Sequence, residues 1–342
     1  MARPTVHDVA SEAGVSLATV DRVLNERPGV RAKTVARVQK AIAALGYVRD
    51  TYAANLARQR DYRFAFLLPE APSQFVDTLK EGLAAACAAQ AAERISAQIY
   101  SVPLDDPHRL VREMERLDTA TLDGVAIMTT ETPQVRDAIT RLKAAGLPVV
   151  SIVADLPSSE RDYFVGIDSV SAGRTAGFLL GRFVQDGPGD ILVLTPSMQA
   201  RDSIERRLGF DAVISRDFPQ LRVLPTLETH AEPERTRMVV ARAAVTYPAI
   251  TGIYSMGAGN APLLDALQAN DLLAGRGVIM HELTPTTREA LLDGRADAVI
   301  AQNIGHLARS ALRVLRAKCD NIPVYEAQER IRIDILTREN LF

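Results

Sequence analysis

The sequence predicts an α/β protein in which an all-α N-terminal headpiece precedes a larger body of two doubly wound parallel-sheet lobes. The first fifty residues hold three short helical patterns, and the rest alternates short apolar runs with helical stretches. Strands that alternate with helices favour parallel sheets covered by helices on both faces. A body of about 280 residues is long for one sheet, and two lobes with a cleft between them fit that length.

The composition of the 342 residues, 47% hydrophobic and 24% charged, is that of a soluble globular protein. No apolar run approaches the roughly 20 residues that a membrane span needs. Arg3, Asp8 and Glu12 interrupt any N-terminal signal-peptide core. We therefore expect a cytoplasmic protein with no membrane partner. Cys87 and Cys319 are far apart and in no metal-binding spacing, which favours packed thiols.

The net charge of −2 hides an asymmetry along the chain. Residues 1–60 carry ten Arg and Lys against five Asp and Glu, a charge of +5, whereas the remainder carries −7. A basic front end on an acidic body indicates a polyanionic partner for the front end alone.

Capping residues delimit the three helices expected in the front end. Thr5 and Ser16 can cap the first two helices, and Asp8 stands in the capping-box position. Gly14 supplies the positive φ of the turn between them, and Gly46 ends the third helix. The apolar faces are Val6, Val9, Ala10 and Ala13, then Val20, Val23 and Leu24, then Val35, Val38, Ile42 and Leu45. Two helices joined by a glycine turn make a helix-turn-helix, whose second helix can enter the DNA major groove.

The residues AGVS-x-x-TV-x-RVLN, followed by a helix that ends in LGY, resemble the LacI/GalR family of bacterial transcription regulators. The resemblance covers residues 5–58. It implies a DNA-binding headpiece over residues 1–48, a hinge helix or linker over 49–60, and an effector-binding and dimerisation domain over 61–342.

The resemblance assigns DNA contacts to the matching positions. Base edges in the major groove fall to Leu17, Ala18 and Arg22, of which Arg22 can pair with guanine O6 and N7. Phosphate contacts fall to Thr5, Ser16, Thr19 and Asn25. Asp21 departs from the serine usual in the family. Either Arg22 or Arg49 holds its carboxylate, or it accepts from a cytosine N4, and both interpretations stay open.

Leu56, nine residues after Tyr47, matches the leucine that the family wedges into the minor groove, and Asn55 lies beside it. An apolar wedge unstacks a base step and bends the duplex. The family often has arginine two residues before this leucine, where this chain has Ala54. A segment this short and rich in alanine is marginal as an isolated helix, which suits folding on DNA.

The body resembles the periplasmic-binding-protein-like effector domain of the same family over nearly its whole length. The expected strands are RFAFLLP, AQIYSVPL, DGVAIMT, PVVSIV, YFVGID, DILVLT, LRVLPTL, ITGIYSM, GVIMHEL and AVIAQN. The resemblance implies crossings between lobes near residues 165, 195 and 325. The lobes would then be about 61–165 plus 300–325, and 166–299 plus 326–342.

Ligand sites in open α/β sheets lie at the carboxyl ends of strands. Candidate effector-binding residues stand at such ends: Ser73, Phe75, Asp155, Asp168, Arg206, Asn260, His281, Glu282 and Gln302. Carboxylates accept bonds from sugar hydroxyls, and arginine donates to ring and hydroxyl oxygens. Many relatives carry Asn-Asp-x-x-Ala where this chain has Met256 to Asn260, so Asn260 would replace the missing amide. Together these residues favour a small polar effector such as a sugar, a polyol or a related compound, with a nucleoside still open.

These observations favour a DNA-binding transcription regulator, a repressor controlled by a small effector, that reads a pseudo-palindromic double-stranded operator as a homodimer. The alternative is a sugar- or nucleoside-acting enzyme, or a binding protein, with an appended DNA-binding module. No P-loop or nucleophile elbow occurs, and Pro285 breaks the HExxH zinc pattern that begins at His281. We therefore expect no enzyme activity, no cofactor and no metal ion. The C-terminal segment IRIDILTRENLF predicts a strand and tail, without the leucine heptads of an added tetramer helix.

Overall fold

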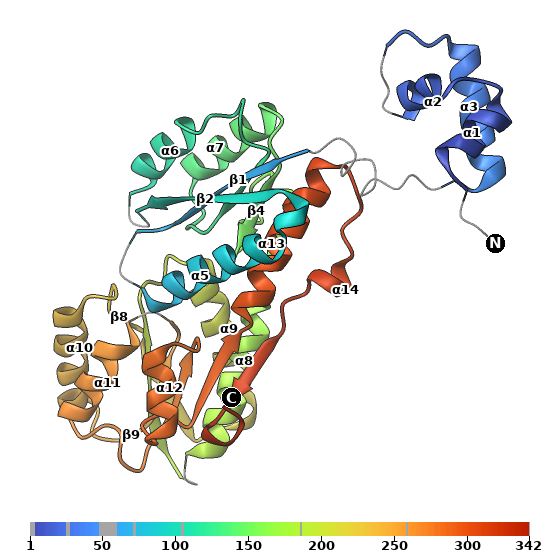
Figure 1. The fold of residues 1–342 in the computed structure, drawn as a ribbon. Coiled ribbons are helices and arrows are strands. Elements are labelled where there is room, and N and C mark those ends of the chain that lie inside the picture. Colours follow the sequence, from blue (N-terminus) through green and yellow to red (C-terminus); the bar gives the residue numbers. More distant parts are fainter. Residues whose placement is uncertain are drawn as a thin grey trace. The chain divides into compact units, whose positions relative to one another are not determined.

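The computed structural model describes residues 4–24, 28–47, 60–70, 73–103, 106–184, 187–257 and 259–341. The chain divides into two compact units, Met1–Arg60 and Asp61–Phe342, which are described separately below (Figure 1). Three residues expected to contact DNA, Asn25, Asn55 and Leu56, lie outside the described residues.

The front unit contains the three expected helices, α1 (Val6–Ala13), α2 (Leu17–Leu24) and α3 (Ala32–Leu45). Its core consists of Val9, Ala10, Ala13, Val20, Val38 and Ala41. The predicted caps are confirmed: Thr5 and Asp8 form a capping box, and Gly14 and Gly46 both have φ of 59°. The expectation that Val6 shares the buried face of α1 is wrong. Its side chain is 36% exposed because the core is built on the later turns of the helix.

The first lobe of the body is a five-stranded parallel sheet in the order β2-β1-β3-β4-β5. Its strands are β1 (Tyr62–Pro69), β2 (Ile95–Val102), β3 (Gly124–Ile127), β4 (Val149–Ile152) and β5 (Tyr163–Val165). Helices α6 (Pro107–Glu115) and α7 (Pro133–Ala144) cover one face, and α5 (Gln74–Ala89) and α13 (Ile304–Cys319) cover the other (Figure 1). A short 3₁₀ turn, η1 (Ala91–Glu93), precedes β2.

The second lobe is a seven-stranded sheet in the order β12-β11-β10-β9-β6-β7, with β8 also paired to β6. Its strands are β6 (Gly189–Thr195), β7 (Leu221–Val223), β8 (Leu227–Glu228), β9 (Ile250–Ser255), β10 (Gly277–His281), β11 (Ala298–Gln302) and β12 (Ile333–Leu336). All pairs are parallel except β11 with β12, so the expected C-terminal strand forms an antiparallel edge.

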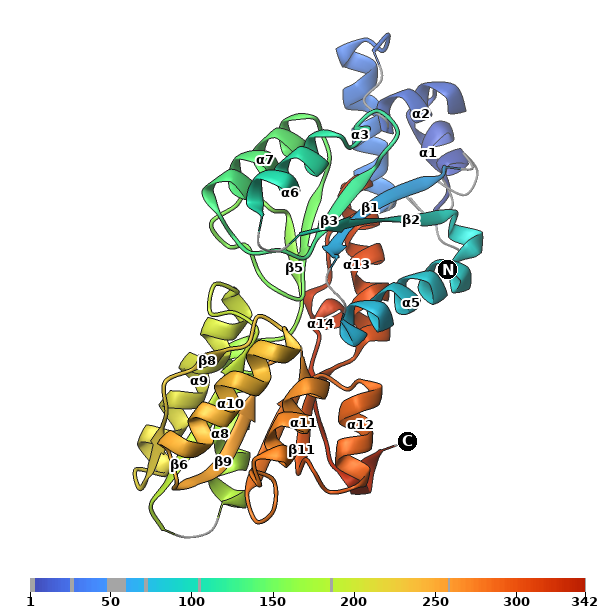
Figure 2. The ribbon, with the colours of Figure 1, turned by 90° about the vertical axis from the view of Figure 1, so that its left-hand side faces the viewer.

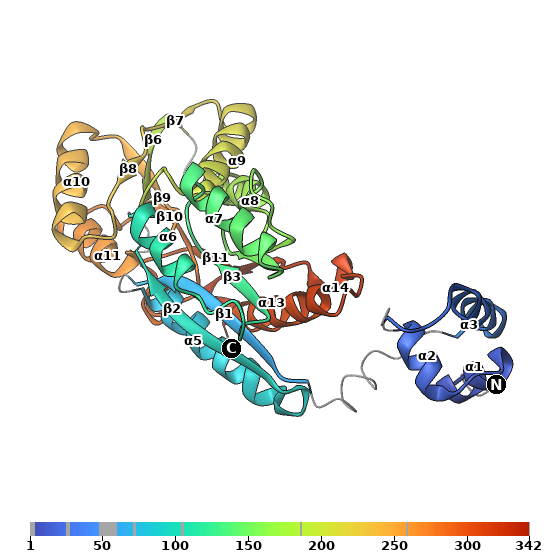
Figure 3. The ribbon, with the colours of Figure 1, turned by 90° about the horizontal axis from the view of Figure 1, so that it is seen from above.

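Helices cover both faces of the second sheet (Figures 2 and 3). On one face lie α8 (Ser169–Phe183) and α9 (Arg201–Asp217), and on the other α10 (Pro233–Thr246), α11 (Asn260–Ala269) and α12 (Pro285–Leu292). The helix α14 (Glu326–Glu329) precedes β12, and the 3₁₀ turn η2 (Arg338–Asn340) follows it. One apolar cluster runs through both lobes, from Phe64 and Phe66 in β1 to Ile191 in β6 and Tyr254 in β9.

The chain crosses between the sheets three times in the body. It passes from β5 to α8, from β11 to α13, and from α14 to β12. The crossing expected near residue 195 is wrong. Strands β6, β7 and β8 all belong to the second sheet, because α9 returns the chain alongside α8 instead of leaving the lobe.

Candidate functional site

The outward face of α2 carries the three residues expected to read base edges. Leu17 is 43% exposed, and Ala18 and Arg22 are also exposed. The opposite face packs inward through Val20, Val23 and Leu24. The helix therefore presents an apolar-and-arginine surface, which suits a thymine methyl and a guanine edge in the major groove.

Two of the hydroxyl residues expected to contact phosphate, Thr5 and Ser16, serve as helix caps in this structure. Ser16 Oγ accepts a bond from the Thr19 amide at 3.2 Å and lies 2.9 Å from Thr19 Oγ1. Thr5 donates to Asp8 Oδ2 through its amide at 2.7 Å and its hydroxyl at 2.8 Å. These bonds lower the pKa of the Asp8 carboxyl. Uncapped amides at a helix N-terminus bind anions, so a phosphate at Thr5 would compete with the Asp8 carboxylate.

A second group of predicted residues meets in a buried polar cluster at the carboxyl ends of β9, β10 and β11. Arg206, on α9, is 2% exposed. Its Nη1 donates to the Met256 carbonyl at 2.5 Å, and its Nη2 donates to Glu282 Oε1 at 3.3 Å. Gln302 Nε2 donates to the same Glu282 oxygen at 2.9 Å. Asp202 Oδ2 lies 3.5 Å from Arg206 Nη1.

Several buried atoms of this cluster have no hydrogen-bond partner among the described residues. They are Arg206 Nε, Glu282 Oε2, Gln302 Oε1 and His281 Nδ1. A buried polar atom without a partner is costly, so native structures satisfy such atoms with protein, water or ligand. Arg206, Glu282 and Gln302 thus each use one part of the side chain to hold a neighbour and keep another polar atom without a partner.

The cluster contains one guanidinium, that of Arg206, and two carboxyl groups, those of Asp202 and Glu282. Burial opposes ionisation of Arg206, but Asp202 and Glu282 outweigh it and raise the pKa of the guanidinium above its ordinary value. Burial raises the pKa of Glu282, although Arg206 and Gln302 act against this. One guanidinium therefore faces two carboxyl groups.

His281 and Tyr254 form a support beneath this cluster. Tyr254 Oη lies 2.8 Å from His281 Nε2, and the Tyr254 ring stacks on Phe210 with centroids 4.5 Å apart. Burial, reinforced by the charge of Arg206, lowers the pKa of His281 well below its ordinary value. His281 is therefore neutral. It is also fully buried.

Asn260 uses both ends of its amide inside the protein. Its Oδ1 accepts from Ser255 Oγ at 2.7 Å, and its Nδ2 donates to the His281 carbonyl at 3.0 Å. It joins the start of α11 to the ends of β9 and β10, which is a structural role next to the site.

The four predicted residues before α9 have structural partners outside this cluster. Ser73 caps α5 and Asp168 caps α8, each by accepting a bond from the amide three residues on. Phe75 is 7% exposed and belongs to the shared apolar core. Asp155 forms a bidentate pair with Arg161. It also reinforces the rise that burial causes in the pKa of Glu205 on α9.

Sequence reasoning missed two members of the cluster. Asp202 stands one helical turn before Arg206, and that i,i+4 spacing was a usable signal. Tyr254 gave no signal, because a tyrosine inside a buried strand has the same pattern as any apolar core residue.

Close helix packing positions Arg206. A Cβ added at Gly173 of α8 would lie 1.9 Å from the Arg206 carbonyl oxygen, and one added at Gly209 of α9 would lie 2.0 Å from the Val170 carbonyl oxygen. The two helices therefore approach backbone to backbone at the turn that holds the guanidinium. Glu282 itself has φ of 68°, a region that costs a non-glycine residue free energy and is concentrated at functional sites.

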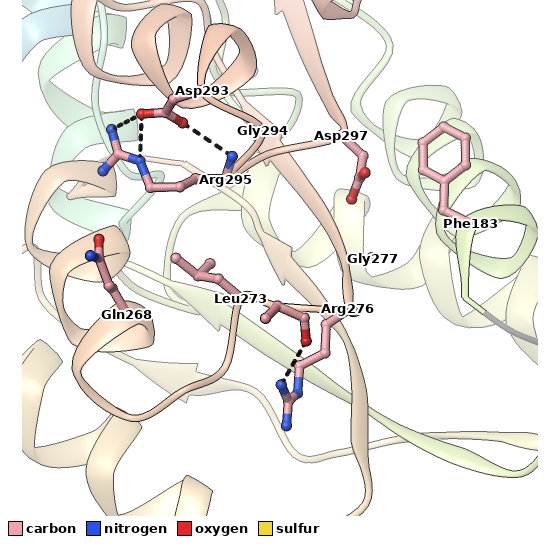
Figure 4. Close-up of a pocket in the computed structure, with 11 residues that line it drawn as sticks. Phe183, Gln268, Leu273, Arg276, Gly277, Asp293, Gly294, Arg295 and Asp297 are labelled. Carbon is pink, nitrogen blue, oxygen red and sulfur yellow. Dashed lines mark hydrogen bonds and ion pairs between the residues drawn. The ribbon is translucent and has the colours of Figure 1, made fainter.

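A pocket of about 830 Å³ lies at the other end of the second sheet (Figure 4). It is lined by Gly277 and Asp297, at the amino ends of β10 and β11, together with Phe183 and other residues. Arg295 there pairs with Asp293 at 2.7 Å, and Arg276 donates to backbone carbonyls. This pocket contains none of the unpartnered atoms of Arg206, Glu282, Gln302 and His281. We therefore take the buried cluster, and not this pocket, as the candidate effector site.

Comparison with known families matches the two units separately. Residues 5–50 match the lacI family of bacterial regulatory proteins, and residues 64–322 match the periplasmic binding protein domain. The chain belongs to the LacI family of regulatory proteins. Its second unit is a periplasmic-binding-protein-like effector domain, and the family consists of transcription regulators and not of enzymes.

Relatives of known name agree with this assignment. The chain is 27% identical over 176 residues to the HTH-type transcriptional regulator DegA of Bacillus subtilis (strain 168), covering 51% of this chain and 50% of DegA. It is 30% identical over 130 residues to the ribose operon repressor of Escherichia coli (strain K12), covering 38% of each chain. The matched stretches thus span half or less of these relatives.

Solved structures share the fold of the body. GanP, a glucose-galactose binding protein from Geobacillus stearothermophilus, superposes with a TM-score of 0.73 at 19% identity, covering 82% of this chain and 99% of its own. An ABC transporter solute binding protein from Burkholderia graminis C4D1M, in complex with D-arabinose, gives 0.73 at 21% identity, covering 82% and 96%.

The described part of the chain contains no helix long and apolar enough to cross a bilayer. In the same residues no group of three or more His, Cys, Asp or Glu side chains is arranged to hold a metal ion.

Proposed function

We propose that this LacI-family regulator represses transcription and that an uncharged polyhydroxy compound, a sugar or polyol, controls its affinity for DNA. The headpiece, the hinge segment and the effector domain would follow the boundaries expected from the sequence, residues 1–48, 49–60 and 61–342. Two headpieces of a homodimer would read a pseudo-palindromic operator, with Leu56 as the minor-groove wedge.

The observation that carries the effector class is the set of unpartnered atoms at the strand ends. Glu282 Oε2 and Gln302 Oε1 are acceptors, and Arg206 Nε is a donor. A matching ligand donates at least two hydrogen bonds and accepts one. Neighbouring hydroxyls of a sugar or polyol meet that requirement, because each hydroxyl both donates and accepts.

The charges around these atoms disfavour an anionic ligand. Arg206 already faces Asp202 at 3.5 Å and Glu282 at 3.3 Å. A phosphate or carboxylate placed beside Arg206 would also lie against these two carboxyl groups, and the repulsion would offset the attraction. The sugar names of the ribose operon repressor and of the D-arabinose complex support the same class of ligand.

A thermal-shift panel tests the effector class. The full chain is heated with ribose, arabinose, glucose, galactose, xylitol and inosine, and with ribose 5-phosphate, glucose 6-phosphate and gluconate as charged counterparts. A ligand present at about 100 times its Kd stabilises the folded state by about 2.7 kcal/mol. We expect a shift with at least one uncharged compound and none with its charged counterpart.

The Arg206→Ala variant is the control, and it should lose the shift. A shift with the phosphorylated compounds alone would overturn the charge argument and leave the regulator proposal intact. No shift with any member of a broad panel would count against the effector role itself.

Arg22 tests the DNA-reading face. Arg22→Ala should relax the base preference at one position of each half-site, because a bidentate arginine–guanine contact discriminates by about 1–3 kcal/mol. The measurement is selection of binding sites from a random duplex library by the full chain. Arg37→Ala, an exposed arginine on α3, is the matched control and should retain the preference. A uniform loss of affinity for all sequences would instead make Arg22 a phosphate contact.

A further inference from the structure

The last connection between the lobes folds back along α13. Residues 320–332, called the strap below, run from the end of α13 to β12 and include α14. Figure 1 shows the strap returning beside α13 before the chain enters the second sheet.

A buried carboxylate fixes the strap to α13. Glu329, at the end of α14, is 6% exposed. Arg313 Nε donates to Glu329 Oε1 at 2.9 Å, and Arg313 Nη2 donates to Oε2 at 2.6 Å. Ser310 Oγ also donates to Oε2, and His306 Nε2 lies 3.0 Å from the Gln328 carbonyl oxygen. Charge-assisted bidentate bonds of this kind are strong and directional.

The α13 residues that hold the strap share one face of the helix. Positions 306, 310 and 313 follow the i, i+4, i+7 spacing. Other positions of α13, including Leu307, Ala311 and Leu315, are fully buried in the core, where the helix packs on α5 and on β3, β4 and β5. The strap is therefore bound to the first lobe as far as Glu329, and residues 330–332 alone lead on to β12.

The other two connections are also short. Gly166, Ile167 and Asp168 separate β5 from α8, and the Asp168 carboxylate caps α8 by accepting from the Ser171 amide at 3.0 Å. Asn303 alone separates β11 from α13 and caps that helix at 2.7 Å from the His306 amide. Gln302, which holds Glu282, is thus the residue directly before a lobe connection.

We propose that Glu329 is a positioning residue whose pair with Arg313 and Ser310 latches the strap to α13 and confines movement between the lobes to three short pivots. These pivots are residues 166–168, residue 303 and residues 330–332. Release of the latch would lengthen the third pivot from residues 330–332 to residues 326–332, because Tyr62 Oη still holds the start of the strap through the Asp320 carboxylate. The lobes would then sample a wider range of separations, which a ligand bound between them would have to narrow again. The inference does not depend on which compound is the effector.

Hydrogen exchange on the full chain tests whether the latch holds the strap. The test variant is Glu329→Gln, and the matched control is Glu326→Gln, which removes the same charge from an exposed position of the same helix. We expect backbone amides of residues 326–331 to exchange about tenfold faster in Glu329→Gln, the factor that corresponds to losing one hydrogen bond to a charged group. Glu326→Gln should exchange like the parent.

A distance measurement tests whether the latch restrains the lobes. Spin labels are attached at Glu81→Cys on α5 and Ala241→Cys on α10, after Cys87 and Cys319 are replaced by serine. Without any ligand, Glu329→Gln should broaden the label-to-label distance distribution by pulsed electron resonance, and Glu326→Gln should not. Arg313→Gln breaks the same pair from the α13 side, and the Arg313 side chain is 29% exposed. If Glu329→Gln fails to fold, Arg313→Gln should broaden the distance distribution in its place.

Two results would overturn the proposal. Unchanged exchange in the strap would mean that Glu329 does not hold it. Faster exchange and a lower urea midpoint with an unchanged distance distribution would mean that the pair only stabilises the fold.

Discussion

Glu282 is a buried carboxyl group in the left-handed backbone region, and two neighbours share one of its oxygens. Replacing it with glutamine keeps the size and removes the charge. If the glutamine at position 282 still accepts bonds from Arg206 and Gln302 with its oxygen, its NH₂ group takes the place of Glu282 Oε2. The ligand then meets a hydrogen-bond donor where the parent offers an acceptor. We expect Glu282→Gln to weaken binding of the uncharged effector about tenfold to a hundredfold, from the loss of a charge-assisted bond. Isothermal titration measures this loss.

The same residue predicts a pH dependence. Burial raises the pKa of Glu282, so its carboxylate protonates at a higher pH than an ordinary glutamate. The acceptor needed by a sugar hydroxyl is present above that raised pKa and is lost as the pH falls through it. Effector affinity of the parent should therefore decline toward acid pH, and that of Glu282→Gln should not. Asp297→Asn, at the opposite end of β11, is the control and should behave like the parent.

The sequence located the polar cluster but could not separate ligand contacts from helix caps. Glu282 and Gln302 were predicted correctly to stand at strand ends, whereas Arg206 lies within α9 and reaches them with its side chain. Ser73 and Asp168 stand at equivalent places and cap helices. In a parallel α/β fold the residue after a strand is often the residue before a helix. A short polar side chain there fits both roles, and only the fold decides between them.

At the scale of elements, most helices and strands could be predicted because their signals are local. Caps, glycine stops and apolar runs lie within a few residues of the boundary they set. The false crossing near residue 195 shows the limit of such signals. Whether β6 is followed by a strand of the same sheet depends on the packing of α9 on α8, which involves residues far apart in sequence.

Gly173 of α8 lies directly against the backbone of α9 at Arg206. Gly173→Ala would place a methyl group 1.9 Å from the backbone oxygen of Arg206, and backbone cannot move aside as a side chain can. We expect the helices to separate, with a loss of about 2 kcal/mol in the free energy of unfolding from overpacking. Arg206 would shift with α9, so effector binding should weaken too. Urea denaturation and isothermal titration measure the two effects.

Gly305→Ala on α13 is the matched control. Its added methyl group would meet the end of the flexible Arg309 side chain at 3.1 Å, which can rotate away. Stability and effector affinity should stay close to those of the parent. Equal losses in Gly173→Ala and Gly305→Ala would show that the close approach of α8 and α9 is not what positions Arg206.

At the scale of the whole molecule, DNA and the effector are expected to bind to parts of the chain with different net charge. The net positive charge lies in residues 1–60, whereas the body carries a net negative charge and its polar cluster is buried. A headpiece that neutralises phosphates releases counterions from DNA. An uncharged ligand held by buried groups releases none. The two partners should therefore respond differently to salt.

Salt titration of the full chain tests this division. With random-sequence duplex DNA, the logarithm of the affinity should fall linearly with the logarithm of the salt concentration, by a slope of about −0.9 for each phosphate neutralised. With an uncharged sugar from the thermal-shift panel, the slope should be close to zero, because neither partner brings counterions to release. A steep salt dependence for the small ligand would contradict the charge balance around Arg206. A flat response for DNA would contradict the role of the basic headpiece, since every phosphate contact made by a cation must appear in that slope.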